Sequence, residues 1–150
     1  MAEVTTKQRA LKMLDRRDYS RAELIRKLVE KGEEETAAEE AVDYLVSLGF
    51  VDDKRYAGLV VRQYAGKGYG QRRVKMELQR HLVPRELWDE ALSQMPEQDD
   101  RIDRFLRQKL SPDADRAEIK KVTDALARRG YGWDEISAAL ERFRNEEFEA

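Results

Sequence analysis

Residues 20–32 (SRAELIRKLVEKG), 70–82 (GQRRVKMELQRHL) and 118–130 (EIKKVTDALARRG) follow one pattern, and this pattern decides the fold. Apolar residues occupy the fifth and ninth positions of each stretch, which places them on one face of a helix, and the last position marks a helix end. The register continues downstream into two further apolar columns. The five columns hold Leu24, Leu28, Gly32, Ala38 and Val42, then Val74, Leu78, Leu82, Trp88 and Leu92, then Val122, Leu126, Gly130, Ile136 and Leu140. Self-similarity at a fixed period predicts a repeat architecture.

Start and stop signals divide the chain into nine expected helices. Ser20 and Glu23 have the spacing of a capping box, and Pro84 and Pro112 suit the first turn of a helix. Glycines at 32, 49, 66 and 130 follow helical runs, as left-handed C-terminal residues do. The expected helices are 6–17, 20–31, 34–48, 52–65, 70–81, 84–95, 99–110, 112–129 and 132–146.

The predicted fold class is therefore all-α, with three tandem three-helix repeats. Their predicted ranges are 1–49, 50–97 and 98–150. No segment alternates with period two for long, so no sheet is expected. A unit of about 50 residues buries too little surface to be very stable alone, and stacked neighbours would extend its core. Repeat proteins of this kind present extended surfaces for binding, so the sequence favours a binding function over catalysis.

Composition excludes several classes of site. The 150 residues include no cysteine and one histidine, which rules out disulfides and thiolate metal sites and leaves no metal cluster for His81. No stretch approaches the roughly 20 apolar residues of a membrane span, and residues 1–8 lack the apolar run of a signal peptide. We expect a cytoplasmic protein with no membrane association.

Charge is distributed unevenly along the chain, although the formal net charge is only −2. Residues 54–85 hold nine Lys or Arg and one Asp or Glu, a local charge of +8. On the helix expected at 70–81, one face carries three arginines around a methionine. A one-signed face with an exposed methionine is typical of a contact surface, whereas a solvated face usually mixes signs. The predicted partner-binding residues are Arg62, Lys67, Arg72, Arg73, Lys75, Met76 and Arg80.

Such a surface suits either DNA phosphates or an acidic protein. The net charge of −2 and the acidic segments on both sides of the basic block argue against a dedicated duplex binder, which usually has a strongly basic domain. A protein partner close to DNA fits better. A helical DNA-binding module that uses residues 72–80 remains the alternative.

No catalytic, cofactor or metal site is predicted. Asp52 and Asp53 are interpreted as the start of a helix, since no third ligand stands at a suitable spacing. Residues 66–70 (GKGYG) lack the ending of a phosphate-binding loop and are interpreted as a helix–helix linker that can serve as a hinge. Trp88 is expected in the core, and His81 is expected to be a partly buried helix-end residue. With no nucleophile and base to pair, we expect no enzyme activity.

Several stretches, in order, resemble the RecX family of bacterial recombination regulators. They are residues 16–24 (RRDYSRAEL), 48–57 (LGFVDDKRYA), 68–74 (GYGQRRV), 77–78 (EL) and 126–131 (LARRGY), and the resemblance spans about residues 10–143. Two local departures concern helix ends: Gln71 stands where the family often has proline, and Arg80-His81-Leu82 stand where it often has Lys-Gly.

The resemblance implies three tandem three-helix repeats in an elongated, curved array. It also implies binding to the RecA recombinase, chiefly within the groove of the RecA–DNA filament. We further expect a monomer and weak direct contact with DNA. The implied outcome is inhibition of the recombinase's ATP hydrolysis, strand exchange and coprotease activity, which modulates homologous recombination, DNA repair and the SOS response. The family is not known for chemistry or cofactors of its own.

Overall fold

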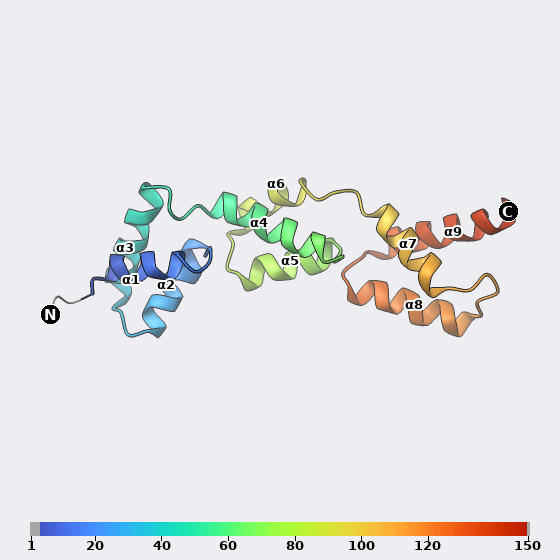
Figure 1. Cartoon of the computed structure of the whole chain (residues 1–150), viewed down its shortest axis with the longest axis horizontal. Helices are drawn as coiled ribbons and strands as arrows, with labels where there is room; N and C mark the ends of the chain where they lie inside the picture. The colour runs from blue at the N-terminus through green and yellow to red at the C-terminus, as the bar shows by residue number, and fades with distance from the viewer. Residues whose placement is uncertain (1–3, 150) are drawn as a thin grey trace. The chain divides into compact units, whose positions relative to one another are not determined.

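A computed structural model describes residues 4–149, and within this range the chain is helical with no strand (Figure 1). No described helix is both long enough and apolar enough to span a bilayer. The elements are α1 (Thr6–Leu14), α2 (Arg21–Glu30), α3 (Glu35–Ser47), α4 (Asp53–Gly66), α5 (Gln71–Arg80), the 3-10 turn η1 (Arg85–Leu87), α6 (Trp88–Leu92), α7 (Asp99–Lys109), α8 (Arg116–Arg128) and α9 (Trp133–Glu149). Residues 1–3, part of the segment considered above for a signal peptide, lie outside the described range.

The apolar columns form the interior, as predicted. In the first repeat, Leu24, Leu28 and Val42 are fully buried and pack in one cluster with residues of α1 and α3. In the third repeat, Leu126 and Ile136 are buried in a second cluster built from α7, α8 and α9. Burial of apolar surface contributes about 25 cal/mol per Å², so these columns supply the main stabilising term of each cluster.

The corresponding residues of the second repeat are buried in the same way, with one exception. Val74 and Leu78 have no exposed surface, and Leu92 is buried. Trp88, predicted to be core, is only half-buried, and its indole N–H donates a hydrogen bond to the carbonyl of Val83 at 3.0 Å. A tryptophan is large and carries one polar atom, so partial exposure is its common state.

The helix-end column is also confirmed, and it includes a residue that is not glycine. Gly32, Leu82 and Gly130 all have positive φ, of 101°, 55° and 97°. In each case the next amide donates back to a carbonyl five residues earlier, as Val83 does to Leu78 at 3.0 Å, which closes a Schellman turn. Leu82 thus adopts the conformation for which its counterparts use glycine, and a left-handed non-glycine residue costs about 1–2 kcal/mol.

Several expected helix boundaries differ from the structure, and three of them concern the glycine and proline signals. Gly66 belongs to the last turn of α4, and the left-handed residue is Gly68, with φ of 88°. Pro112 does not begin α8; the helix starts at Arg116, because the side chain of Asp115 accepts a hydrogen bond from the amide of Glu118 and caps the N-terminus there. Pro84 precedes a 3-10 turn before the short α6 instead of one continuous helix.

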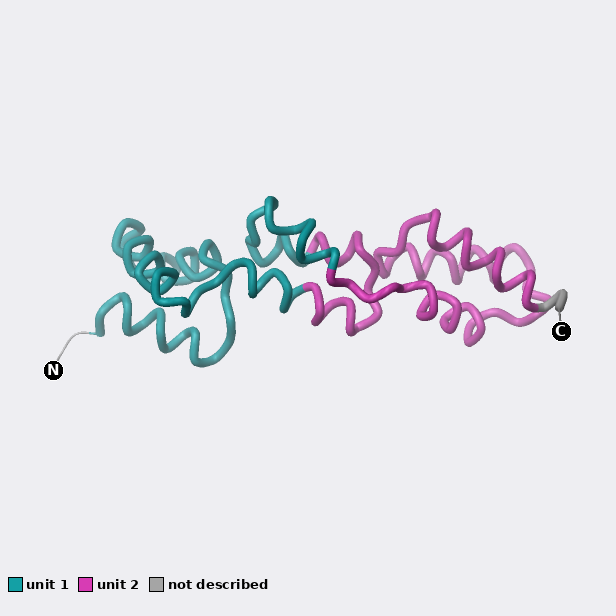
Figure 2. The backbone as a smooth tube through the Cα atoms, turned by 90° about the horizontal axis from the view of Figure 1, so that it is seen from above, with its two compact units in different colours: residues 1–60, 77–93 teal, residues 61–76, 94–150 magenta. Residues whose placement is uncertain are grey.

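Contacts divide the chain into two compact units (Figure 2). One contains residues 1–60 and 77–93, and the other contains residues 61–76 and 94–150. The division passes through α4 and α5, so each unit combines one terminal repeat with part of the second. The units do not follow the repeat pattern, and the predicted repeat ranges 1–49, 50–97 and 98–150 stay a prediction.

Candidate partner-binding surface

The α5 helix presents an outer face without negative charge. Its exposed residues are Gln71, Arg72, Lys75, Met76, Gln79 and Arg80. Met76 is 62% exposed, and the Arg80 side chain is 75% exposed. Positions 72, 76 and 80 are four residues apart and therefore follow one line along the helix. Cations on both sides of an exposed thioether give this face both electrostatic and apolar binding capacity.

Glu77, the one acidic residue of α5, does not lie on this outer face. Its side chain is buried, with only 3% of the residue exposed. A carboxylate oxygen lies 3.8 Å from Nε2 of His81, one helical turn along, and 3.9 Å from a guanidinium nitrogen of Arg80. The spacing of four residues between Glu77 and His81 was the sequence signal for this placement.

Three other predicted residues lie in different surroundings. Arg73 is half-buried, and its guanidinium lies 5.0 Å from the centre of the Tyr69 ring. Arg62 is exposed and donates to the amide oxygen of Gln94 at 3.4 Å. Lys67 is exposed beside the ring of Tyr64. The candidate surface on α5 therefore consists of Arg72, Lys75, Met76 and Arg80.

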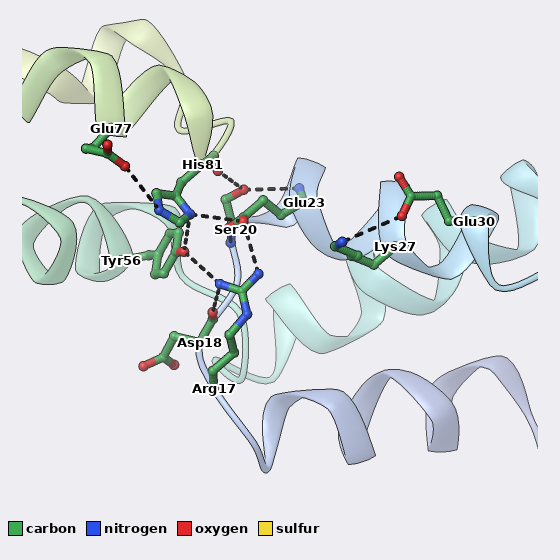
Figure 3. A network of polar contacts seen from close by, with 9 residues as sticks. All are labelled: Arg17, Asp18, Ser20, Glu23, Lys27, Glu30, Tyr56, Glu77 and His81. Carbon is green, nitrogen blue, oxygen red and sulfur yellow. Dashed lines mark hydrogen bonds and ion pairs between the residues drawn. The ribbon is translucent and has the colours of Figure 1, made fainter.

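The end of α5 is joined to the start of α2 through a buried serine (Figure 3). The Ser20 hydroxyl accepts a hydrogen bond from the amide of Glu23 at 3.1 Å and donates one to the carbonyl of His81 at 2.7 Å. The Glu23 carboxylate in turn accepts from the amide of Ser20 at 3.1 Å, which completes the predicted capping box. One hydroxyl thus caps α2 and fixes the turn that follows α5.

The Glu23 carboxylate lies at the centre of a group of polar side chains that come from the segment before α2, from α4 and from the end of α5 (Figure 3). It lies 3.2 Å from a guanidinium nitrogen of Arg17 and 3.1 Å from Nδ1 of His81. The Tyr56 hydroxyl stands 3.2 Å from the same His81 nitrogen. Burial alone would raise the pKa of Glu23, but hydrogen bonds from Ser20, His81 and Tyr56 outweigh it and the pKa is lowered. Burial raises the pKa of Tyr56, so its hydroxyl stays neutral.

Asp52 and Asp53 act as helix-start residues, as predicted, but for two different helices. Asp52 accepts from the amide of Arg55 at 3.1 Å and caps α4. Asp53 instead accepts from the amide of Arg21 at 2.8 Å, at the N-terminus of α2. A carboxylate at this position complements the positive end of the α2 dipole. The pair therefore ties α4 to α2.

A second junction, in the other unit, relies mainly on backbone groups. The amide of Gly70 donates to the carbonyl of Arg129 at 2.8 Å, and the amide of Arg72 donates to the carbonyl of Gly130 at 3.1 Å. A Cβ at Gly70 would lie 2.6 Å from backbone atoms of Gly130 and Tyr131. The Tyr131 hydroxyl also donates to the carbonyl of Gly68 at 2.7 Å. The linker 66–70 is therefore held by hydrogen bonds at Gly68 and Gly70.

The two junctions occupy equivalent places in the repeats. Gly70 follows Ser20 by 50 residues, and Arg129 follows His81 by 48 residues, which are the offsets of the apolar columns. In both junctions, the residue just before the second helix of a repeat donates a hydrogen bond to a carbonyl just after the second helix of the following repeat. Ser20 donates to His81, and Gly70 donates to Arg129. The sequence predicted the helix-end column but not these contacts. Periodicity shows which residues face the interior of a repeat, but not which residues contact the neighbouring repeat.

Comparison with known proteins agrees with this architecture. The family models described as the first, second and third three-helix domains of RecX match residues 7–45, 52–92 and 97–140. This chain belongs to the RecX family. The Regulatory protein RecX of Vibrio campbellii is 35% identical over 140 residues, covering 91% of this chain and 90% of the relative. That of Xanthomonas axonopodis pv. citri is 39% identical over 140 residues, covering 91% and 86%.

Solved structures support the RecX fold. The crystal structure of RecX from Lactobacillus salivarius superposes with a TM-score of 0.83 at 22% identity and covers 91% of this chain and 93% of its own. A second crystal structure, of a regulatory protein RecX, gives a TM-score of 0.80 at 19% identity. The relatives are named regulatory proteins. The all-α fold with three three-helix domains and the RecX resemblance are thereby confirmed.

Proposed function

We propose that this RecX protein binds the RecA recombinase and its DNA filament through α5 and inhibits ATP hydrolysis, strand exchange and coprotease activity. It would act as a cytoplasmic monomer that modulates recombination, DNA repair and the SOS response, without catalytic activity or a cofactor of its own. Membership of a family named for regulation supports a binding role.

The observation that carries the proposal is the one-signed outer face of α5. Every exposed residue of this helix is cationic or neutral, and the single acidic residue, Glu77, is buried. A cationic face on a protein of net charge −2 favours contact with an acidic surface or with phosphates. The DNA of a RecA–DNA filament offers phosphates. Electrostatic steering toward such a filament would raise the association rate and make it sensitive to salt.

The test combines a charge reversal with a matched control. The triple variant Arg72→Glu, Lys75→Glu and Arg80→Glu should bind the RecA–DNA filament far more weakly and lose inhibition of strand exchange. The control reverses Arg116, Lys120 and Arg144, which are also exposed cations elsewhere in the chain. Arg73 stays unchanged because it is half-buried. Both variants should keep the wild-type circular dichroism spectrum and melting midpoint.

The measurements are filament binding, RecA ATP hydrolysis and strand exchange with purified proteins. Uninhibited exchange at saturating wild-type protein would refute the filament-regulator proposal. Equal losses for both triple variants would show that α5 has no special part. Binding of wild-type protein to naked DNA as tightly as to the filament would favour the DNA-binding alternative, with a steep dependence on salt.

A further inference from the structure

A cavity of about 330 Å³ lies beside the linker after α4, within the unit that contains the third repeat. Residues 66–68, helix α7 and the end of α8 line it. Its lining includes four cationic side chains and no carboxylate. The cations are Lys67, Arg101, Arg104 and Arg129.

None of these four cations forms an ion pair among the described residues. Arg101 donates to the carbonyl of Ala65, and the Arg129 guanidinium lies 4.8 Å from the centre of the Phe105 ring. Arg107, on the same α7 helix but outside the cavity, does pair with a carboxylate, that of Glu146 at 3.7 Å. Four unneutralised cations around one cavity repel one another, and a bound anion would relieve this repulsion.

Two of the cations are already held in place, and the tyrosine in the lining adds no negative charge. The contacts to Ala65 and Phe105 restrict Arg101 and Arg129, so less side-chain entropy is lost when a ligand binds. Burial raises the pKa of Tyr131, and the charges of Arg101 and Arg129 only partly oppose this rise. The Tyr131 hydroxyl, which donates to the carbonyl of Gly68, therefore stays neutral.

We propose that this cavity binds a phosphate group, supplied by a nucleotide or by the backbone of a nucleic acid. Guanidinium groups match phosphate oxygens in two-pronged hydrogen bonds, and a phosphate spreads its charge over several oxygens that more than one cation can reach. A single carboxylate from a protein partner would use fewer of the donors. The volume of about 330 Å³ leaves room for the sugar attached to the phosphate.

The inference goes beyond the proposed role of α5. Lys67 alone is shared with the partner-binding residues predicted from the sequence, and Arg104 belongs to neither α5 nor the contacts that hold the linker. A substitution of Arg104 therefore tests the cavity without altering the α5 surface.

The experiment follows backbone amide signals by NMR while phosphate probes are added to the whole protein. The probes are ATP without metal and a short oligothymidine strand. Gly68, which lines the cavity, should shift with at least one probe at millimolar concentration, and Gly32, which lies in the first repeat, should not. A shift with ATP alone identifies a nucleotide as the phosphate source, and a shift with the strand alone identifies nucleic acid; either result supports the site.

Arg104→Gln is compared with Arg107→Gln, the same change on the same helix outside the cavity. Arg104→Gln should lower the affinity for the responding probe by about three- to tenfold, the effect of losing one charged contact. Arg107→Gln should change this affinity by less than about twofold. No shift at Gly68 with either probe, or equal effects of both variants, would overturn the proposal. A glutamate peptide of matched charge that shifts Gly68 as strongly as ATP would also overturn it.

These outcomes are independent of the α5 proposal. The α5 triple reversal should retain the ATP or oligothymidine response at Gly68 even where filament binding is lost. Loss of inhibition with an intact Gly68 response would refute neither the cavity nor the assignment of its ligand.

Discussion

Gly70 and Gly130 meet backbone to backbone, with the amide of Arg72 donating to the carbonyl of Gly130 at 3.1 Å. A Cβ on Gly130 would collide with the backbone nitrogen of Arg73, and one on Gly70 would lie 2.6 Å from the Gly130 carbonyl carbon. The beginning of α5 and the turn after α8 can approach this closely only because neither residue has a side chain. This contact fixes the junction between the second and third repeats.

Gly130→Ala should destabilise the protein by about 2–4 kcal/mol. Alanine would have to adopt the left-handed backbone conformation of residue 130, and its methyl group would collide with backbone atoms. Gly32→Ala is the matched control. Gly32 occupies the same column with φ of 101°, but nothing lies within 4 Å of its added Cβ. It should cost only about 1–2 kcal/mol. Chemical denaturation measures both values, and equal losses would mean that the junction tolerates a side chain.

Glu23→Gln should lower the free energy of unfolding by about 1–3 kcal/mol at neutral pH, because a buried, charged acceptor is lost. The folded-state pKa of Glu23 is lowered. Its contribution is therefore fully present above the ordinary carboxyl pKa and is lost as the pH falls through the folded-state value. Wild type and variant should converge in stability in acid. Glu40→Gln, an exposed carboxylate on α3, is the control and should have little effect at any pH.

Leu78→Ala should cost about 2–5 kcal/mol, because Leu78 has no exposed surface and its loss leaves a cavity. Met76→Ala, two residues away on the same helix and 62% exposed, should change stability by less than about 0.5 kcal/mol. Urea unfolding distinguishes them. A large effect at Met76 would contradict its placement on the outer face.

Met76→Ser should weaken binding to the RecA filament several-fold without loss of stability, since truncating an exposed apolar residue within a charged contact surface removes buried area on binding. Val29→Ser, at a 41% exposed apolar residue on α2, provides the comparison and should leave binding unchanged. Binding titrations at two salt concentrations would separate the apolar contribution from the ionic one. Identical affinities for the two variants would remove Met76 from the interface.

Sequence periodicity predicted most of the interior, because helical spacing decides which residues share one face of a helix. It placed Leu24, Val74 and Leu126 correctly and found the helix end at Leu82, although leucine rarely adopts that conformation. It failed at Pro112, where the competing cap at Asp115 starts α8 four residues later. Propensity cannot rank two nearby start signals, whereas a side-chain hydrogen bond decides between them.

The candidate surface was predictable in part. Arg72, Lys75, Met76 and Arg80 follow from the helical angle and are exposed. Arg73 does not belong with them, because the start of α5 approaches the Gly130 turn, and the sequence holds no sign of that contact. The basic cavity was missed for the same reason, since Lys67, Arg101 and Arg129 come from segments that only tertiary folding unites.

The two equivalent junctions differ in how freely they can change during evolution. The Ser20–His81 junction depends on side chains, so one substitution can weaken it and another polar side chain able to donate to the same carbonyl can replace serine. The Gly70–Arg129 junction depends on main-chain atoms and on the absence of a side chain at two positions. Any amino acid is compatible with its hydrogen bonds at residue 129, but no residue other than glycine fits at 70 or 130. The Ser20–His81 junction can therefore keep its geometry while its residues change, whereas the Gly70–Arg129 junction keeps its geometry only if both glycines are retained.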